Sequence, residues 1–107
     1  MQPAVYDITI YQRATFRRQV NLPLSLIGHT VTAQVWDEKR RSKIFDFDIE
    51  WINRGNGTFY LVADFDKTTR MKKDGEWDLM VSYPNGDRFY WVEGKAIFDP
   101  GYTDPDD

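Results

Sequence analysis

Cysteine is absent from the 107 residues, and histidine occurs only once, at His29. Without a thiol the chain can form no disulfide, bind no zinc through thiolates and use no cysteine nucleophile. The domain could therefore be made in a reducing cytoplasm and work unchanged outside it, so composition leaves the compartment open. His29 follows Gly28 at an expected strand entrance, and we expect it to serve a turn rather than catalysis.

Long apolar runs and an excess of positive charge are also missing. No segment approaches the length needed to span a bilayer, and the first residues lack the charged and apolar regions of a signal peptide. We therefore expect neither an export signal nor a membrane anchor in this sequence. The 14 Lys and Arg residues against 17 Asp and Glu residues give a formal net charge of -3. Sequence-independent binding to phosphate backbones is disfavoured by this balance, so nucleic acid is not an expected partner.

Recognisable catalytic patterns are scarce. The serines lie in no nucleophile-elbow context, and Gly55-Asn56-Gly57 is followed by no helix that could hold phosphate. We therefore expect a non-enzymatic protein with no catalytic residue and no cofactor.

Three carboxylates stand at strand spacing on one face, at Asp46, Asp48 and Glu50. They could help to hold calcium if Asp64 or Asp66 came near. Side chains spaced about 7 Å apart along a strand cannot all reach one ion. We therefore expect a solvated charged face that offsets nearby basic residues, and no metal site. Adjacent carboxylates on one strand also lack the opposed geometry that an acid-base enzyme needs around its substrate.

Alternation with a period of two residues runs through almost the whole chain, and it predicts half-buried strands. Aromatic residues make up 16% and apolar residues 41% of the sequence, which is enough for one core. The inward positions expected from the alternation are Tyr6, Ile8, Ile10, Phe16, Val20, Val31, Ala33, Val35, Phe45, Phe47, Ile49, Trp51, Phe59, Leu61, Ala63, Phe65, Trp77, Leu79, Val81, Tyr83, Tyr90, Val92, Gly94, Ala96 and Phe98.

Turn signals separate these runs at intervals of about 8 to 12 residues, which is typical of a sandwich or barrel. Asn85-Gly86 is the strongest of them because it is a common hairpin code. The only expected helix is one short turn over residues 66–73, capped by Asp66. Local pattern thus predicts a single all-β domain, a sandwich or barrel of about seven or eight strands, over residues 1–100. Residues 101–107 are expected to form a loose acidic tail.

The aromatic residues of the last two strands divide between core and surface in this reading. Trp77 and Tyr83 share the inward parity of their strand. If Tyr90 and Val92 point inward on the return strand, then Phe89 and Trp91 point outward. Trp36 also lies on the polar side of its expected strand, with Thr32 and Gln34. Exposed aromatic surface marks contact with a partner, although a neighbouring loop or a bulge would give these rings a structural role instead.

The basic stretch Glu38 to Lys43, with the sequence EKRRSK, falls between two expected strands. Its simplest interpretation is a polar hairpin loop. A more specific interpretation is a contact patch for an acidic partner, centred on Arg40 and Arg41.

Six short motifs follow one another along the chain: Thr15-Phe16, Leu26-Ile27-Gly28-His29-Thr30, Ala33-Gln34-Val35, Gly75-Glu76-Trp77-Asp78-Leu79, Asn85-Gly86 and Glu93-Gly94. Their order, from Tyr6 to about Pro100, resembles the small immunoglobulin-like β-sandwich domain of tailed-phage virion proteins. The resemblance implies a single immunoglobulin-like antiparallel sandwich of about seven or eight strands. Such domains are similar to the collar proteins that fix tail fibres and to the anchoring domains of baseplate upper proteins. Two departures are Arg13-Ala14, where comparable N-terminal segments often have glycine before the Thr-Phe strand, and the paired bases Arg40-Arg41.

The resemblance implies a structural role without chemistry, in multiple copies on a symmetric tail, collar, neck or capsid component. Its expected partners are other phage structural proteins or further copies of the chain, and its expected location is the virion after synthesis in the host cytoplasm. The alternative is a carbohydrate-binding module that uses exposed aromatic rings. Residues expected to contact a partner are Trp36, Arg40, Arg41, Phe89 and Trp91.

Overall fold

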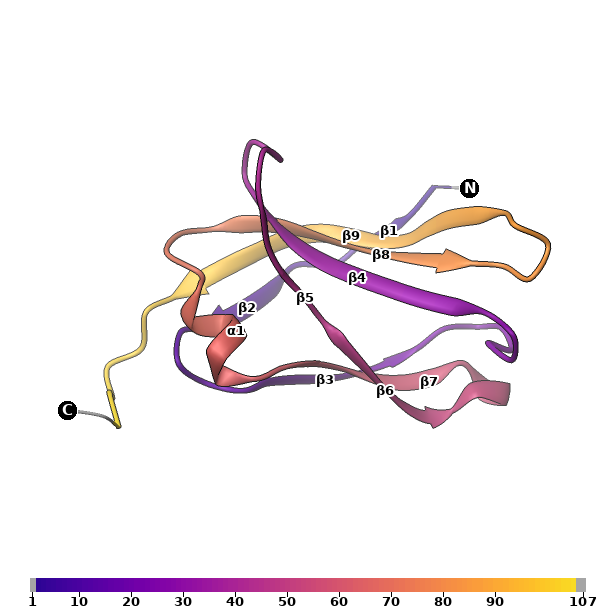
Figure 1. Cartoon of the computed structure of the whole chain (residues 1–107), viewed down its shortest axis with the longest axis horizontal. Coiled ribbons are helices and arrows are strands. Elements are labelled where there is room, and N and C mark those ends of the chain that lie inside the picture. Colours follow the sequence, from indigo (N-terminus) through magenta and orange to yellow (C-terminus); the bar gives the residue numbers. More distant parts are fainter. Residues whose placement is uncertain (1, 106–107) are drawn as a thin grey trace.

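The structure, a computed structural model, describes residues 2–105 and consists of two β-sheets packed face to face. The six-stranded sheet has the order β1-β9-β8-β4-β5, and β2 also pairs with β9. The three-stranded sheet has the order β3-β7-β6. Figure 1 shows the two layers, with the short helix α1 (Phe65–Thr69) at one end. The strands are β1 (Ala4–Val5), β2 (Ile8–Tyr11), β3 (Phe16–Asn21), β4 (Thr30–Asp37), β5 (Lys43–Asp46), β6 (Asp48–Asn53), β7 (Thr58–Ala63), β8 (Gly75–Ser82) and β9 (Arg88–Asp99).

The predicted all-β sandwich is therefore confirmed, with nine described strands rather than seven or eight. Two expected strands are each divided in two. The N-terminal segment from residue 4 to residue 11, which we call the leader, breaks at Tyr6 and Asp7 between β1 and β2. Both halves run parallel to β9. The run from Lys43 to Asn53 breaks at Phe47, where the chain leaves one sheet for the other. The leader thus pairs within its own sandwich.

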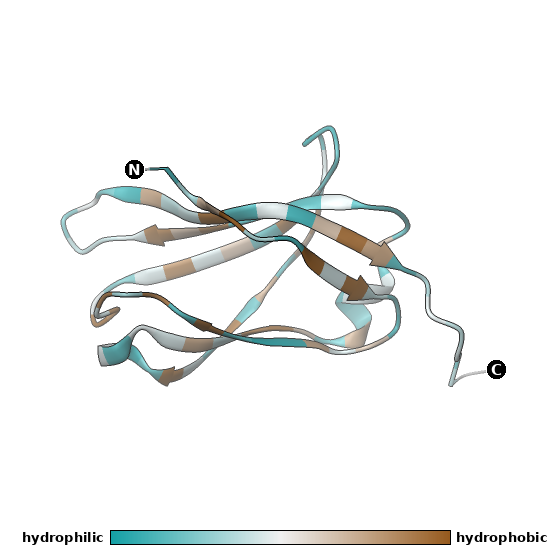
Figure 2. Ribbon diagram, turned by 180° about the vertical axis from the view of Figure 1, so that it is seen from behind, coloured by the Kyte–Doolittle hydropathy of each residue, from teal (hydrophilic) through white to brown (hydrophobic). Residues whose placement is uncertain are grey.

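Alternating residues of both sheets fill the space between the layers, and this matches most of the predicted core. Figure 2 shows hydrophobic and hydrophilic residues alternating along the strands. Phe47 joins the layers, because its ring packs against Phe16 of the small sheet and Trp77 of the large one. Fully buried large side chains include Ile8, Ile10, Leu26, Val35, Phe45, Phe59, Leu61, Met71, Leu79 and Val81.

The short helix differs from its prediction in position and cap. It spans only Phe65–Thr69, and its N-cap is Asp64, whose carboxylate accepts a hydrogen bond from the Lys67 amide at 3.0 Å. Asp64 takes this role because it leaves β7 with extended backbone angles, as an N-cap does. Phe65 was expected inward but is exposed, since the helix begins there and ends the strand alternation.

Each of the three aligned carboxylates has its own basic partner. Asp46 pairs with Lys43, Asp48 with Lys67, and Glu50 with Arg17, at 2.9, 3.1 and 2.6 Å. The three ion pairs lie at separate places along the strands. This arrangement matches the expected charged face that offsets basic residues.

Candidate binding face on the six-stranded sheet

The outer face of the six-stranded sheet carries polar and aromatic side chains in regular rows across the strands. One row joins Trp36 of β4 to Glu76 of β8 and Lys95 of β9. The next row joins Gln34, Asp78 and Glu93. A third row joins Thr32, Met80 and Tyr90. We call the surface formed by these nine residues the outer face.

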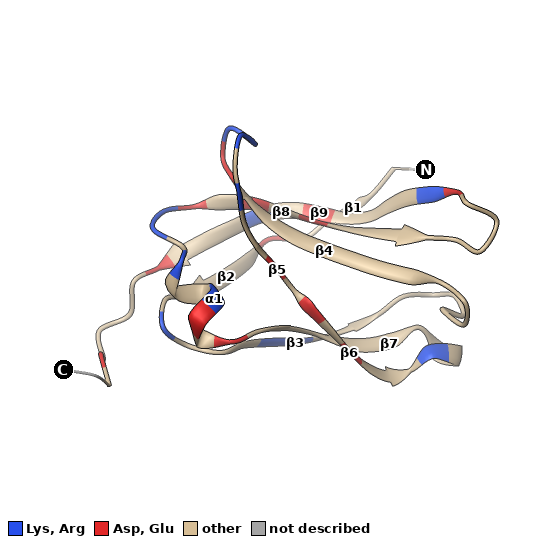
Figure 3. Ribbon diagram, in the orientation of Figure 1, with Lys and Arg blue, Asp and Glu red and all other residues tan. Residues whose placement is uncertain are grey.

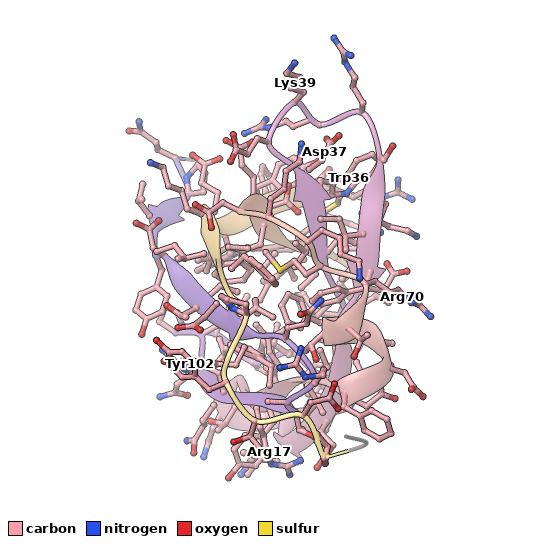
Figure 4. The ribbon with its side chains drawn as sticks, turned by 90° about the vertical axis from the view of Figure 1, so that its left-hand side faces the viewer. Arg17, Trp36, Asp37, Lys39, Arg70 and Tyr102 are labelled. Atoms are coloured by element: carbon pink, nitrogen blue, oxygen red, sulfur yellow. The ribbon has the colours of Figure 1, made fainter. Side chains whose placement is uncertain are left out.

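The hairpin between β4 and β5 forms a wall at one side of the outer face. Figures 1 and 4 show it rising from the sheet on the side away from the small sheet, with Lys39 near its tip. A register shift between Val35 and Trp36 bends the strand pair, and Arg40 takes a left-handed backbone with φ of 55°. The Arg40 Nε donates to Glu76 Oε2 at 2.5 Å, which ties the hairpin to the sheet.

Wall and sheet together enclose a depression of about 600 Å³. It extends over β4, β8 and β9 and reaches the leader at Val5 and Asp7. Most of its charged lining is acidic: Asp7, Glu76, Asp78 and Glu93, against Arg40 and Lys95. The depression is therefore a partly apolar hollow with an acidic floor.

Asp78 and Glu93 form a like-charge pair at the centre of this floor, directly opposite each other on β8 and β9. Opposed carboxylates on neighbouring strands repel. Partial burial raises the pKa of the Asp78 carboxyl, the guanidinium of Arg40 opposes that rise, and Glu93 adds to it. None of the four ion pairs among residues 2–105 includes either carboxylate. The floor would thus be stabilised by an added positive charge.

Trp36 stands at the foot of the wall and is held in place by polar contacts. Its Nε1 donates to Gln34 Oε1 at 2.9 Å, and the Gln34 amide donates to Asp46 Oδ1 at 2.8 Å. The side chain remains half-buried, and Figure 4 labels it below the hairpin. A ring fixed in this way can contact a ligand with little loss of side-chain entropy.

Of the five predicted contact residues, Trp36 and Arg40 line the depression. Arg41 lies in the same hairpin, exposed, with its backbone amide bonded to Asp37 Oδ1 at 2.7 Å. Figure 3 shows the basic residues gathered at this hairpin. The sequence prediction of a polar hairpin loop for this stretch is thus correct, and its role as a contact patch stays a prediction.

The predicted outward direction of Phe89 and Trp91 is wrong. A register shift after Leu79 places Phe89 opposite Val81 on the inward parity and Tyr90 opposite Met80 on the outer face. Phe89 packs its ring on Tyr83 near the hairpin end and stays 38% exposed. Trp91 packs partly buried against the core. The bulge supplies the physical reason, because an extra residue inverts the alternation on one side of it.

Sequence reasoning therefore missed Tyr90, which is 49% exposed and lines the depression with Met80. The only available signal was that all four residues of Phe89-Tyr90-Trp91-Val92 are apolar or aromatic, so both faces of the strand look alike. Such a run does not show where a bulge lies. Trp91 instead lines a second, more apolar hollow of about 590 Å³ between the leader and β3. Arg18 reaches across this hollow and donates a hydrogen bond to the Tyr6 hydroxyl.

The outer face offers charge, hydrogen-bonding groups and aromatic surface, which suit the binding of a polar or cationic group. Within residues 2–105, His, Cys, Asp and Glu nowhere gather in a group of three that could hold a metal ion. No helix in that range is long and apolar enough to cross a membrane. Neither the comparison with protein-family models nor the comparison with curated proteins finds a match for this chain.

Proposed function

We propose that this chain is a non-enzymatic structural protein of a tailed-phage particle, which docks in multiple copies onto a symmetric tail, collar, neck or capsid component. The resemblance of its motifs to virion sandwich domains suggests this role. Docking of this kind forms no covalent bonds, and a modest interface gains strength when several copies bind one ring.

One observation supports the proposal most directly: two of the four glycines in the shared motifs, Gly75 and Gly94, occupy close backbone contacts of the β-sandwich. A Cβ added at Gly75 would lie 2.4 Å from the Trp36 carbonyl oxygen. A Cβ at Gly94 would lie 2.1 Å from that of Tyr6. Real Cβ atoms do not approach so closely, so both positions favour glycine for steric reasons. The motifs thus belong to a scaffold, as expected of a structural domain.

The proposal is tested by locating the chain in purified particles of the phage that encodes it. Mass spectrometry shows whether it is present, and an electron-microscopy reconstruction counts its copies at each symmetric position. A fixed copy number at a ring or vertex is the expected result. Absence from the particle would overturn the proposal.

A second candidate, carbohydrate binding, is favoured by the fixed Trp36 ring beside the polar groups of the outer face. Aromatic rings stack on sugar faces, and neighbouring carboxylates and amides bind hydroxyl groups. The test is sugar-dependent quenching of tryptophan fluorescence with a panel of bacterial polysaccharide fragments. Quenching that Trp36→Ala abolishes and Trp51→Phe retains would support it. Unchanged fluorescence across the panel would remove it.

A further inference from the structure

The β4–β5 hairpin, which forms the wall beside the depression, is basic, and we call its residues 38–43 the arm. From Glu38 to Lys43 it carries four basic residues and one acidic residue. Arg40 bonds Glu76, and Lys43 bonds Asp46, whereas Lys39 and Arg41 enter none of the ion pairs formed by residues 2–105. Figure 4 shows Lys39 directed away from the body.

Asp78 and Glu93 on the floor of the depression carry the opposite charge, and neither carboxylate enters an ion pair formed by residues 2–105. Asp78 and Glu93 repel each other across β8 and β9, and Arg40, whose guanidinium acts on the Asp78 carboxyl, is already bonded to Glu76. A second guanidinium or ammonium group placed over this pair would reduce the repulsion. Because the site is partly buried, salt would screen that attraction less than it screens a fully exposed pair.

Arm and floor lie side by side on one surface of the molecule. The arm rises on the outer side of the six-stranded sheet, and its Arg40 lines the same depression as Asp78. A twofold axis through such a surface brings each arm over the floor of the other copy, because every contact in an isologous pair occurs twice. We propose that two copies of this chain associate in this way. The arm of each copy docks, through Lys39 and Arg41, on Asp78 and Glu93 of the other.

This contact rests on the proposed function and deepens it, because it names a surface through which copies of the chain would pair within an assembly. A second copy is favoured over another occupant because the chain itself supplies both complementary charges on one face. A neutral sugar would leave the repulsion between Asp78 and Glu93 in place, so the charge pattern gives it no advantage.

The experiment measures self-association of the full chain by sedimentation equilibrium, from about 10 μM to about 1 mM at low salt. Two charge-reversed variants are compared with the unchanged chain. The arm variant is Lys39→Glu with Arg41→Glu, and the face variant is Asp78→Lys with Glu93→Lys. Each is expected to weaken association at least about tenfold, because each turns two attractive contacts into repulsive ones. Lys72→Glu with Lys73→Glu is the control for the arm variant, since it makes the same charge change as that variant at exposed residues elsewhere.

Mixing the two variants gives the decisive result. An arm variant and a face variant meet with complementary charges at both contacts, so the mixture is expected to associate although neither variant does alone. Carrying all four substitutions in one chain should restore association as well. Circular dichroism and thermal unfolding of each variant show that the fold persists.

Three results would overturn the proposed contact: a monomer across the whole concentration range, association unaffected by charge reversal, or failure of the mixture to restore it. These measurements use isolated protein and do not depend on particles. If self-association fails while the chain is still found in particles at fixed copy number, the contact is wrong and the structural role stands.

Discussion

The indole Nε1 of Trp77 donates a hydrogen bond of 2.8 Å to the backbone carbonyl of Tyr6, 71 residues earlier in the chain. This bond fixes the leader where it changes from β1 to β2. The Tyr6 amide donates to the Glu93 carbonyl at 2.8 Å, and Asp7 accepts from the Lys95 amide at the same distance. The leader is thereby joined to β9 through polar contacts as well as strand pairing.

Replacement of Trp77 by Phe should loosen the leader and lower the free energy of unfolding by about 2 kcal/mol. It removes buried volume and the hydrogen bond to Tyr6 together. Urea unfolding measures the loss, and hydrogen exchange should show faster exchange of the Tyr6 and Lys95 amides. Trp36→Phe, which loses an indole bond only to a side chain, should cost about 1 kcal/mol or less. Equal costs for the two variants would contradict the role given to Trp77.

The Gly94→Ala variant should be destabilised by about 2 kcal/mol or more, because the added methyl group meets the Tyr6 carbonyl. Gly86→Ala is the matched control. Gly86 has a φ of 95° and open space around it, so its substitution costs only backbone strain, about 1 kcal/mol. Thermal unfolding compares the two. A smaller loss at Gly94 than at Gly86 would show that the leader can move aside cheaply.

Arg13 adopts a φ of 68°, the left-handed region that favours glycine. Its guanidinium donates to the Pro100 carbonyl at 3.0 Å and to Gln12 Oε1 at 3.0 Å. Arg13→Ala and Arg13→Gly both remove these bonds, but only alanine keeps the strained backbone. The glycine variant should therefore be about 1 kcal/mol more stable than the alanine variant in denaturant unfolding. Equal stability of the two would argue against strain at this position.

The pKa shift of Asp78 predicts a stability that falls as pH rises. Because partial burial raises the pKa of this carboxyl in the folded state, the folded state binds the proton more tightly than the unfolded state. Its contribution to stability is present at low pH and is lost between the ordinary and the raised pKa. Asp78→Asn should therefore be more stable than the unchanged chain near pH 7, with a smaller advantage at about pH 3.

Asp46 should give the opposite pH dependence and serves as the internal comparison. The hydrogen bond from Lys43 lowers the pKa of its carboxyl, and the Gln34 amide acts in the same direction. The stabilisation is therefore present above the ordinary pKa of aspartate and is lost as pH falls through the lowered value. Asp46→Asn should be less stable than the unchanged chain at neutral pH and should approach it in acid. Unfolding curves over the same pH range test both signs.

Much of the outer face could be predicted from local pattern, and part of it could not. Trp36 lies on the polar side of β4, as its parity predicted, and Arg40 lies in the hairpin that its charged neighbours predicted. Tyr90 and Trp91 exchanged their predicted directions because of the register shift after Leu79. A bulge is set by the pairing of two strands, so neither strand alone reveals where the alternation inverts.

By itself, the amino-acid sequence determined that the chain forms strands and which side chains of most strands are buried. Positions such as Ile8, Val35 and Leu61 follow from local alternation, because successive side chains of a strand point to opposite faces. Only the tertiary structure decided that Asp78 meets Glu93 beneath a basic arm, and that Trp77 holds Tyr6. These relationships depend on register and on contacts between distant segments, which local pattern does not encode.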